Sequence, residues 1–172
     1  MPRRSKRQEA LPHRAPEHVR TVYIETSVWG MTVPGQPPAL RQPTLEFLRQ
    51  CGLGFFAPYI STVVTKEVAQ APEWEVAQME QRISGLAPTI LEPSAESDQL
   101  AEVYLKAGII PAKKEDDARH VAIATVARID LVVSWNHKHL SGERKGPLFN
   151  AANRLAGYEH PLLILTPFGA LQ

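Results

Sequence analysis

Residues 21–30 are TVYIETSVWG, and their first part has the composition of a buried strand. The run at residues 22–24 is wholly apolar, but a carboxylate, Glu25, follows it directly, and two hydroxyl residues, Thr26 and Ser27, come next. Parallel sheets place their chemistry at the carboxyl ends of the strands. An acid and two hydroxyls at the end of a first strand therefore indicate a functional edge of a sheet.

The overall composition is typical of a globular protein and excludes several other classes. A chain of 172 residues predicts one domain, and its 44% hydrophobic and 22% charged residues are ordinary values. No apolar run approaches the roughly 18 residues that a membrane-spanning helix needs, and no apolar segment follows the basic N-terminus as in a signal peptide. The single cysteine, Cys51, excludes an intramolecular disulfide and a cysteine-based zinc cluster. We expect no membrane association, a cytoplasmic protein and a buried, unreactive Cys51.

Residues 1–20 differ from the rest of the chain in charge. They contain six Lys and Arg residues and two Glu residues, a balance of +4, whereas the whole chain carries +1. Three prolines and a shortage of large apolar side chains predict a disordered leader. Such a leader either attracts nucleic acid electrostatically or only adds solubility. Residues 21–172 form the predicted folded domain.

Strand and helix patterns alternate through residues 21–172. Strands are predicted at about residues 21–25, 55–62, 88–93, 130–136 and 161–167. Helices are predicted at about residues 43–51, from 61 or 62 onward, and at 73–84, 94–108, 115–129 and 147–156, with Trp74, Ala77 and Ile83 on the apolar side of the third. This alternation predicts βαβ units, a mainly parallel sheet and helices on both of its faces.

Three other places on the chain bring acids or amides to the same predicted edge. Glu67 lies in the helix after the second strand, Asp116 and Asp117 open the fifth helix, and Asn136 ends the fourth apolar run. Taken singly, each position has an ordinary explanation. Glu25 ends a strand in water, Glu67 is exposed on a helix, the aspartates cap a helix, and Asn136 is a turn residue.

Other polar residues near these positions have less specific patterns. The spacing of His120, His137 and His139 matches no zinc motif, so we expect roles in helix packing and loops. Lys113 and Lys114 precede the aspartates, and they either hold phosphates or remain solvated at the surface.

The sequence contexts of these positions resemble a known family. The segments VYIETSVWG, STVVTKEV, DDARHVAIATVARIDLVVSWNHKHL and PLLILTP resemble, in order and spacing, the motif blocks of PIN-domain ribonucleases, and most closely the toxins of the VapC type. The resemblance covers about residues 21–168, and the block from Asp117 to Asn136 is its most specific part. It implies a three-layer α/β/α fold and an endoribonuclease that depends on Mg²⁺ or Mn²⁺.

The resemblance also implies a role for each candidate residue. The four catalytic positions of the family fall on Glu25, Glu67, Asp117 and Asn136, with Asn136 at a position that is commonly aspartate; Thr26 and Ser27 match the hydroxyl pair after the first acid, and Asp116 supports the third. We assign direct metal contact to Glu25 and Asp117, because Mg²⁺ usually takes only one or two carboxylates directly. Glu67 then binds the metal through water or orients the nucleophile.

The implied partners are an RNA substrate, a second copy of the chain in a homodimer, and a cognate antitoxin that blocks the acidic pocket. Two alternatives remain within the same family: a stand-alone PIN nuclease in RNA processing, and a degenerate, non-catalytic RNA-binding module. A phosphatase or a nucleotide-binding α/β protein is disfavoured, because the sequence has no glycine-rich phosphate loop.

Overall fold

The computed structural model describes residues 19–172, so the predicted disordered leader lies outside the described residues except for its last two. The centre of the fold is a sheet of five strands, all parallel, in the order β3-β2-β1-β4-β5. The strands are β1 (Arg20–Ile24), β2 (Phe56–Ser61), β3 (Thr89–Leu91), β4 (Leu131–Val133) and β5 (Leu163–Leu165). All five lie where the sequence predicts strands, although β1 begins at Arg20, a residue assigned to the leader.

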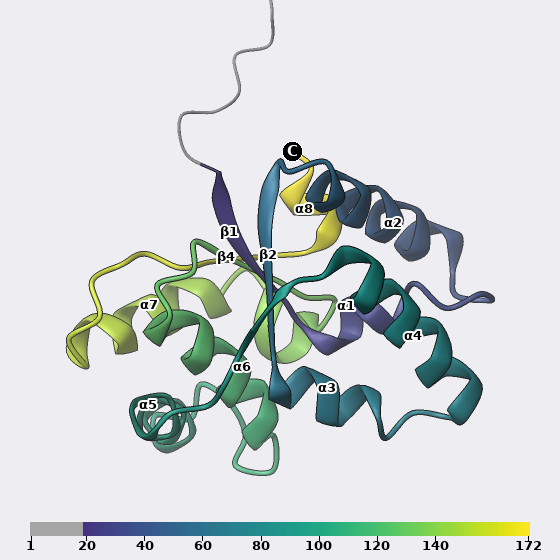
Figure 1. Cartoon of the computed structure of the whole chain (residues 1–172). Helices are drawn as coiled ribbons and strands as arrows, with labels where there is room; N and C mark the ends of the chain where they lie inside the picture. Colours follow the sequence, from purple (N-terminus) through teal and green to yellow (C-terminus); the bar gives the residue numbers. More distant parts are fainter. Residues whose placement is uncertain (1–18) are drawn as a thin grey trace, which may run out of the picture.

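Helices cover both faces of this sheet. They are α1 (Thr26–Gly30), α2 (Pro38–Gly52), α3 (Thr62–Val68), α4 (Glu73–Leu86), α5 (Ala95–Lys106), α6 (Glu115–Val126), α7 (Lys145–Leu155), α8 (Pro167–Ala170) and a short π-helix, η1 (His137–Ser141). Helices α2 and α4 lie on one side of the sheet, and α5, α6 and α7 lie on the other (Figure 1). The predicted three-layer α/β/α fold is therefore confirmed. Within residues 19–172, no helix is long and apolar enough to cross a membrane.

The two central strands are the most deeply buried part of the sheet. Residues 22–24 of β1 and all three residues of β4 are buried. Because helices cover both faces, these strands are apolar at successive positions instead of alternating with polar residues. Burying each large apolar side chain stabilises the fold by about 1.5–3 kcal/mol. A shift of β1 or β4 along its axis would expose such side chains, so burial fixes the position at which each strand ends.

The chain changes direction across the sheet between β1 and β4. From β1 it moves outward to β2 and β3, and after α6 it returns to the other side of β1 to form β4 and β5. Ile24 pairs with Val133, and the next amide, Glu25 N–H, donates to the Val133 carbonyl at 3.0 Å. Ligands of open α/β sheets bind at such switch points, beyond the carboxyl ends of the strands. The predicted functional edge is thus the one that Glu25 occupies.

Helix α2 begins earlier than the sequence predicts. It starts at Pro38 instead of residue 43, because a proline at the first helical position needs no N–H partner, and Pro43 is tolerated inside the helix. Cys51 near its end is buried, as predicted, and burial raises the pKa of its thiol to about 12. Helices α1 and α8 were not predicted, because four or five residues are too few to give a helical period.

The prediction for Trp74 is wrong. Its side chain is 57% exposed, and the buried residue of α4 is Met79. Ala77, predicted on the same side, is exposed as well, whereas Ile83 packs against the core as predicted. The inward stripe of α4 is Val76, Met79, Ile83 and Leu86, whose spacings of three and four residues follow the helical period. Trp74 lies about 200° around the helix from Val76, so it points away from the core.

Candidate functional site

Glu25 lies at the junction of β1 and α1, where three hydrogen bonds hold one of its oxygens. Its side chain is 4% exposed, and Oε2 caps α1 by accepting from Ser27 N–H at 3.2 Å. The Ser27 hydroxyl donates to the same oxygen, and the Ser134 hydroxyl donates to it at 2.7 Å. Within residues 19–172 the other oxygen, Oε1, accepts no hydrogen bond. The carboxylate is therefore fixed through Oε2, and Oε1 is left for another partner.

The two serines also connect the start of α1 to the loop after β4. Trp135 N–H donates to the Ser27 hydroxyl at 2.9 Å, and Asn136 N–H donates to the Ser134 hydroxyl at 2.9 Å. Ser134 is fully buried, and sequence reasoning overlooked it. The available signal was its position directly after β4, where a hydroxyl ends the strand next to β1.

Glu67 on α3 receives hydrogen bonds from two other segments. Its Oε1 atom accepts from the Thr26 hydroxyl at 2.7 Å and lies 2.6 Å from His120 Nε2. The Glu67 side chain is 28% exposed, whereas that of His120 is fully buried. Thr26 and Glu67, which the sequence placed in separate motif blocks, are thus in direct contact.

His120 on α6 has a second partner at its other ring nitrogen. Nδ1 lies 2.7 Å from the Tyr23 hydroxyl, which lies 2.6 Å from the Ser61 hydroxyl. Tyr23, Ser61 and His120 are all fully buried. His120 packs in the core, as the sequence predicts, but it also connects β1 and β2 to Glu67. Sequence reasoning missed this connection, because Tyr23 and Ser61 read as ordinary strand residues.

The charges around His120 shift two pKa values in opposite directions. Complete burial disfavours the charged imidazole, but the hydrogen bond with Glu67 and the charges of Glu25, Glu67 and Asp117 outweigh burial and raise the pKa of His120. Partial burial of Glu67 is likewise outweighed, mainly by the hydrogen bond and charge of His120, and the pKa of Glu67 is lowered. Both directions favour an ion pair between a protonated His120 and an ionised Glu67.

Asp117 differs from its neighbour Asp116 in its surroundings. Asp117 is partly buried, and its buried Oδ2 atom has no hydrogen-bond partner within residues 19–172. Asp116 is exposed, and its Oδ1 atom accepts from Arg119 at 3.3 Å. A buried carboxylate oxygen without a hydrogen-bond partner costs free energy. A cation bound to Asp117 would offset that cost.

Asn136 is the cap of η1. Its Oδ1 atom accepts a hydrogen bond from His139 N–H at 3.1 Å. The turn role that the sequence allowed is therefore present, although an amide oxygen retains a second lone pair.

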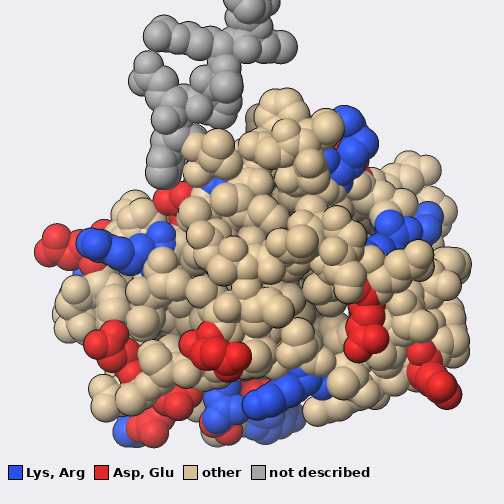
Figure 2. Space-filling view, in the orientation of Figure 1, with Lys and Arg blue, Asp and Glu red and all other residues tan. Residues whose placement is uncertain are grey.

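Two cavities open beside Glu67 at this edge of the sheet. One, of about 410 Å³, is lined by Glu67, Lys113, Lys114, Glu115, Asp116, Asp117 and Arg119. The other, of about 400 Å³, shares Glu67, Asp116 and Arg119 with the first and adds Lys66 and Asp98 among others. Charged side chains gather along the lower edge of the molecule in Figure 2, the edge where α3 lies in Figure 1, while the middle of that face is mostly uncharged. The acids of the site thus lie among basic side chains.

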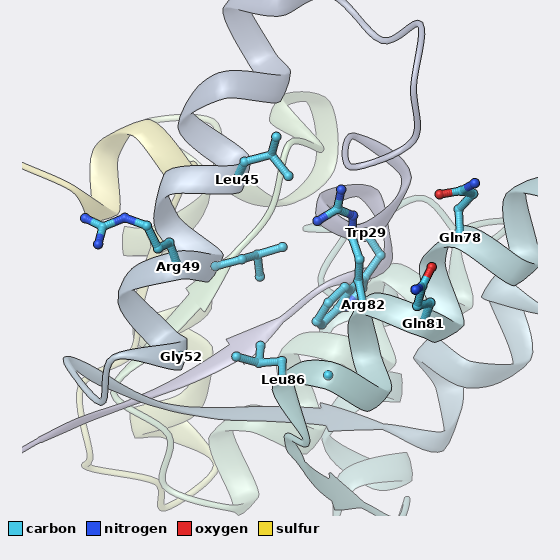
Figure 3. A pocket seen from close by; sticks show the side chains of 10 residues that line it. Trp29, Leu45, Arg49, Gly52, Gln78, Gln81, Arg82 and Leu86 are labelled. Atoms are coloured by element: carbon cyan, nitrogen blue, oxygen red, sulfur yellow. The ribbon is translucent and has the colours of Figure 1, made fainter.

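A larger cavity, of about 620 Å³, lies elsewhere, between α2 and α4. Trp29 and three leucines line it, with Arg49 and Arg82 among its polar residues (Figure 3). None of the described residues around it is Asp or Glu, so it offers no carboxylate ligand. The smaller cavities beside Glu67 are the candidates for chemistry, because Glu67 lines both and Asp117 lines one of them, whereas Glu25 lines neither.

Two acids at this edge have carboxylate oxygens available for a divalent metal ion. Within residues 19–172, no group of three or more Asp, Glu, His or Cys side chains is arranged to hold a metal ion as it stands. Two carboxylates completed by water are, however, a usual set for Mg²⁺. Glu25 has an oxygen that accepts no hydrogen bond, and Asp117 has a buried oxygen without a partner. In their donor chemistry, these two carboxylates match such a site.

The structure thus brings Glu67 into contact with His120 and Thr26, places Asp117 in the same cavity as Glu67, and bonds Ser27 to Glu25. No known family model matches this chain, and no curated protein matches it. The interpretation of the site therefore depends on its geometry and on the motif resemblance.

Proposed function

We propose that this chain is a PIN-domain endoribonuclease that requires Mg²⁺ or Mn²⁺, and that it is the toxin of a toxin–antitoxin pair. One observation carries the proposal: Asp117 has a buried carboxylate oxygen with no hydrogen-bond partner within residues 19–172, and it lines the same cavity as Glu67. Two acids at one cavity repel one another, and a single protonated histidine offsets only part of that charge. A divalent cation removes the remaining cost.

The residues divide the work according to their contacts. Glu25 and Asp117 would hold the ion, because each has an oxygen with no partner within residues 19–172. When bound, the ion lowers the pKa of water and stabilises negative charge on the phosphodiester oxygens. Glu67 orients the attacking water with Oε2, the oxygen that receives neither Thr26 nor His120. Lys113 and Lys114, which line the same cavity, attract the phosphates of RNA.

The partners belong to the same proposal and come from the motif resemblance. The chain acts as a homodimer, and a cognate antitoxin covers the acidic pocket. A stand-alone nuclease in RNA processing would have the same site without the antitoxin.

A second candidate, a non-catalytic RNA-binding module, is favoured by one contact. The Asn136 oxygen is already used to cap η1, so the fourth position of the motif supplies no charge. Binding of Mn²⁺ separates the two, since only the enzyme requires the ion.

The experiment combines RNA cleavage with metal binding in one matched set of proteins. Wild type, Asp117→Asn and Glu102→Gln are compared on total RNA and on a mixed-sequence RNA with Mg²⁺, with Mn²⁺ and with EDTA. Asp117→Asn and EDTA should each reduce cleavage by about 10²-fold or more, because several kcal/mol of transition-state stabilisation are lost. Glu102→Gln removes a carboxylate from an exposed ion pair on α5 and should cleave like wild type.

Calorimetric titration of Mn²⁺ into the same three proteins completes the test. Asp117→Asn should bind Mn²⁺ more weakly than wild type and Glu102→Gln. Full cleavage in EDTA, or Mn²⁺ binding that does not depend on Asp117, would contradict the proposed metal site. RNA binding without cleavage under every metal condition would favour the non-catalytic module.

A further inference from the structure

One oxygen of Glu67 receives two hydrogen bonds, while the other oxygen receives none. Thr26 and His120 both contact Oε1, at 2.7 Å and 2.6 Å. Within residues 19–172, Oε2 has no hydrogen-bond donor, and Glu67 lines both cavities at this edge. The carboxylate is therefore oriented: Oε1 is anchored to the protein, and Oε2 is left without a donor.

The contacts of His120 determine which of its nitrogens donates to Glu67. An ionised carboxylate has only lone pairs, so the 2.6 Å contact with Oε1 requires a proton on Nε2. Nδ1 faces the Tyr23 hydroxyl at 2.7 Å, and this hydroxyl can either accept from a protonated Nδ1 or donate to a neutral one. In both cases the Tyr23 hydroxyl holds the imidazole at Nδ1, and the Nε2–H donates to Glu67.

The anchor behind the imidazole is rigid. Tyr23 belongs to the central strand β1, Ser61 ends the neighbouring strand β2, and both are fully buried. The Tyr23 and His120 rings are 5.7 Å apart at their centroids, so they also pack against each other. A chain of hydrogen bonds thus runs from the sheet through His120 to Glu67, a site acid on α3 whose side chain is 28% exposed.

We propose that His120 is a positioning residue, which Tyr23 and Ser61 hold in place so that its Nε2–H fixes Oε1 of Glu67 and leaves Oε2 to act in the cavity. This assignment rests on the proposed nuclease function for its effect on catalysis, but the hydrogen bond itself does not depend on that function. His120 touches neither metal ligand nor substrate, so its removal affects the rate through Glu67.

The test uses two amide substitutions that divide the contacts of the imidazole. In His120→Gln, the amide reaches the position of Nε2 and donates to Glu67. In His120→Asn, the shorter amide reaches only the position of Nδ1 and contacts Tyr23. Both variants place a neutral amide in the same buried space, so a general loss of packing affects both. Thermal unfolding of each establishes that it folds.

Three measurements are made on wild type and on both variants. The first is cleavage of RNA with Mg²⁺, with kcat and KM determined separately over a range of pH. The second is Mn²⁺ affinity by calorimetry. The third is NMR: the ¹⁵N shifts of the His120 ring in wild type, and the ¹³C titration of the Glu67 carboxyl in all three proteins.

The expected result separates the two amides. His120→Asn should lower kcat about 10- to 100-fold with little change in KM or Mn²⁺ affinity, as is typical when an outer contact of a site residue is lost. His120→Gln should stay within about threefold of wild type. The wild-type ring should carry its proton on Nε2, and the pKa of Glu67 should rise in His120→Asn more than in His120→Gln.

Two results would overturn the assignment: equal kcat values in two folded variants, or a wild-type ring without a proton on Nε2. If wild type cleaves no RNA with any metal, the proposed function fails, and the NMR measurements alone decide the positioning role. In that case a selective rise of the Glu67 pKa in His120→Asn supports it, and equal titrations in both variants refute it. If His120→Asn does not fold, Thr26→Val, which removes the other donor to Oε1, should lower kcat without weakening Mn²⁺ binding, and an unchanged kcat refutes the role.

Discussion

Two buried hydrogen-bond networks in this fold contain similar residues, but one reaches a partly exposed carboxylate and the other stays within the core. The charged network consists of Tyr23, Ser61, His120 and Glu67, and the neutral network consists of Tyr104, Thr125 and Asn153. Each places a fully buried tyrosine hydroxyl between the hydroxyl of a Ser or Thr and a side chain that contains nitrogen. In each, burial is the main reason that the pKa of the tyrosine is raised, so both phenols stay protonated.

The two networks differ in where they stop. The neutral network closes on itself, since Thr125 donates onward to the Val121 carbonyl at 2.8 Å within its own helix, and all of its members are at most 3% exposed. The charged network continues to Glu67, which is 28% exposed and lines two cavities. A closed, satisfied network contributes to stability and to specific packing. The charged network places a protonated His120 against the Glu67 carboxylate, so it also affects the chemistry of the cavity that Glu67 lines. The following predictions separate a role in stability from a role in that chemistry.

The largest effect on stability is expected when a charge is introduced into the neutral network. Asn153→Asp replaces an amide that is 1% exposed, so its carboxylate loses the Nδ2 donor and faces the Thr125 oxygen without a cation. We expect the free energy of unfolding at pH 7 to fall by about 3 kcal/mol or more, as for other uncompensated buried charges. Urea unfolding at pH 7 and pH 4 checks this, because the introduced carboxyl becomes protonated at low pH and should regain stability. An equal loss at both pH values would show that shape, not charge, matters there.

The tyrosines provide a matched pair for activity. Tyr23→Phe and Tyr104→Phe each remove one buried hydroxyl and keep the ring, so each should cost roughly 0.5–1.5 kcal/mol of stability. Only Tyr23→Phe frees the His120 ring from its anchor, and we expect it alone to lower the kcat for RNA cleavage, by about tenfold. Comparing kcat and thermal unfolding for both variants tests the distinction. Equal kcat values in the two variants would mean that the charged network, like the neutral one, is only structural.

The contrast between the networks also marks what the sequence could predict. The apolar runs, the alternation of strand and helix, and the acid after the first strand were local patterns, and they predicted the parallel sheet and the edge that Glu25 occupies. Tyr23 and Ser61 carry no local signal, and Ser134 carries only its position after a strand, because a hydroxyl at a strand end or a tyrosine within a strand is compatible with many surroundings. Their roles arise from contacts across 38 to 109 residues of sequence, which depend on strand order and register.

Trp74 and α2 show a different limit of the prediction. Trp74 was placed inward because of its apolar type, but the periodicity of its helix puts it outside. The start of α2 was placed too late because its two prolines look like a loop in the sequence. In both cases the type of a residue is a weaker guide to its place than its position within the helix.

The pH dependence of stability should differ between the networks. The pKa of His120 is raised above its ordinary 6.5, so the stability contributed by its protonation is fully present below about pH 6.5 and is lost as the pH rises through the raised value. The pKa of Glu67 is lowered below its ordinary 4.5, so its contribution is present above about pH 4.5 and is lost as the pH falls through the lowered value. The pair therefore contributes most between these values.

Urea unfolding from about pH 5.5 to pH 8.5 measures the alkaline side of this dependence. Wild type should lose stability over this range, and His120→Gln should lose less, because its amide does not titrate. Tyr104→Phe should parallel wild type, since the neutral network contains no group that titrates there. A His120→Gln profile that parallels wild type would show that His120 does not change its charge in the folded protein over this range.

The smallest change in stability is expected at Asn136, an amide like Asn153 but in a charged and partly exposed place. Asn136→Asp keeps the oxygen that accepts from His139 N–H, and aspartate is as good a helix cap as asparagine, so the free energy of unfolding should change by no more than about 0.5 kcal/mol. Asn136→Ala removes the cap and should cost about 1 kcal/mol. Calorimetry with Mn²⁺ then separates the cap from the proposed metal site. If the fourth motif position faces the ion, Asn136→Asp adds a carboxylate and tightens Mn²⁺ binding, by about tenfold for a charge a few ångströms away. If Mn²⁺ binds all three proteins equally, Asn136 is only the cap of η1, and its amide resembles that of Asn153 in being purely structural.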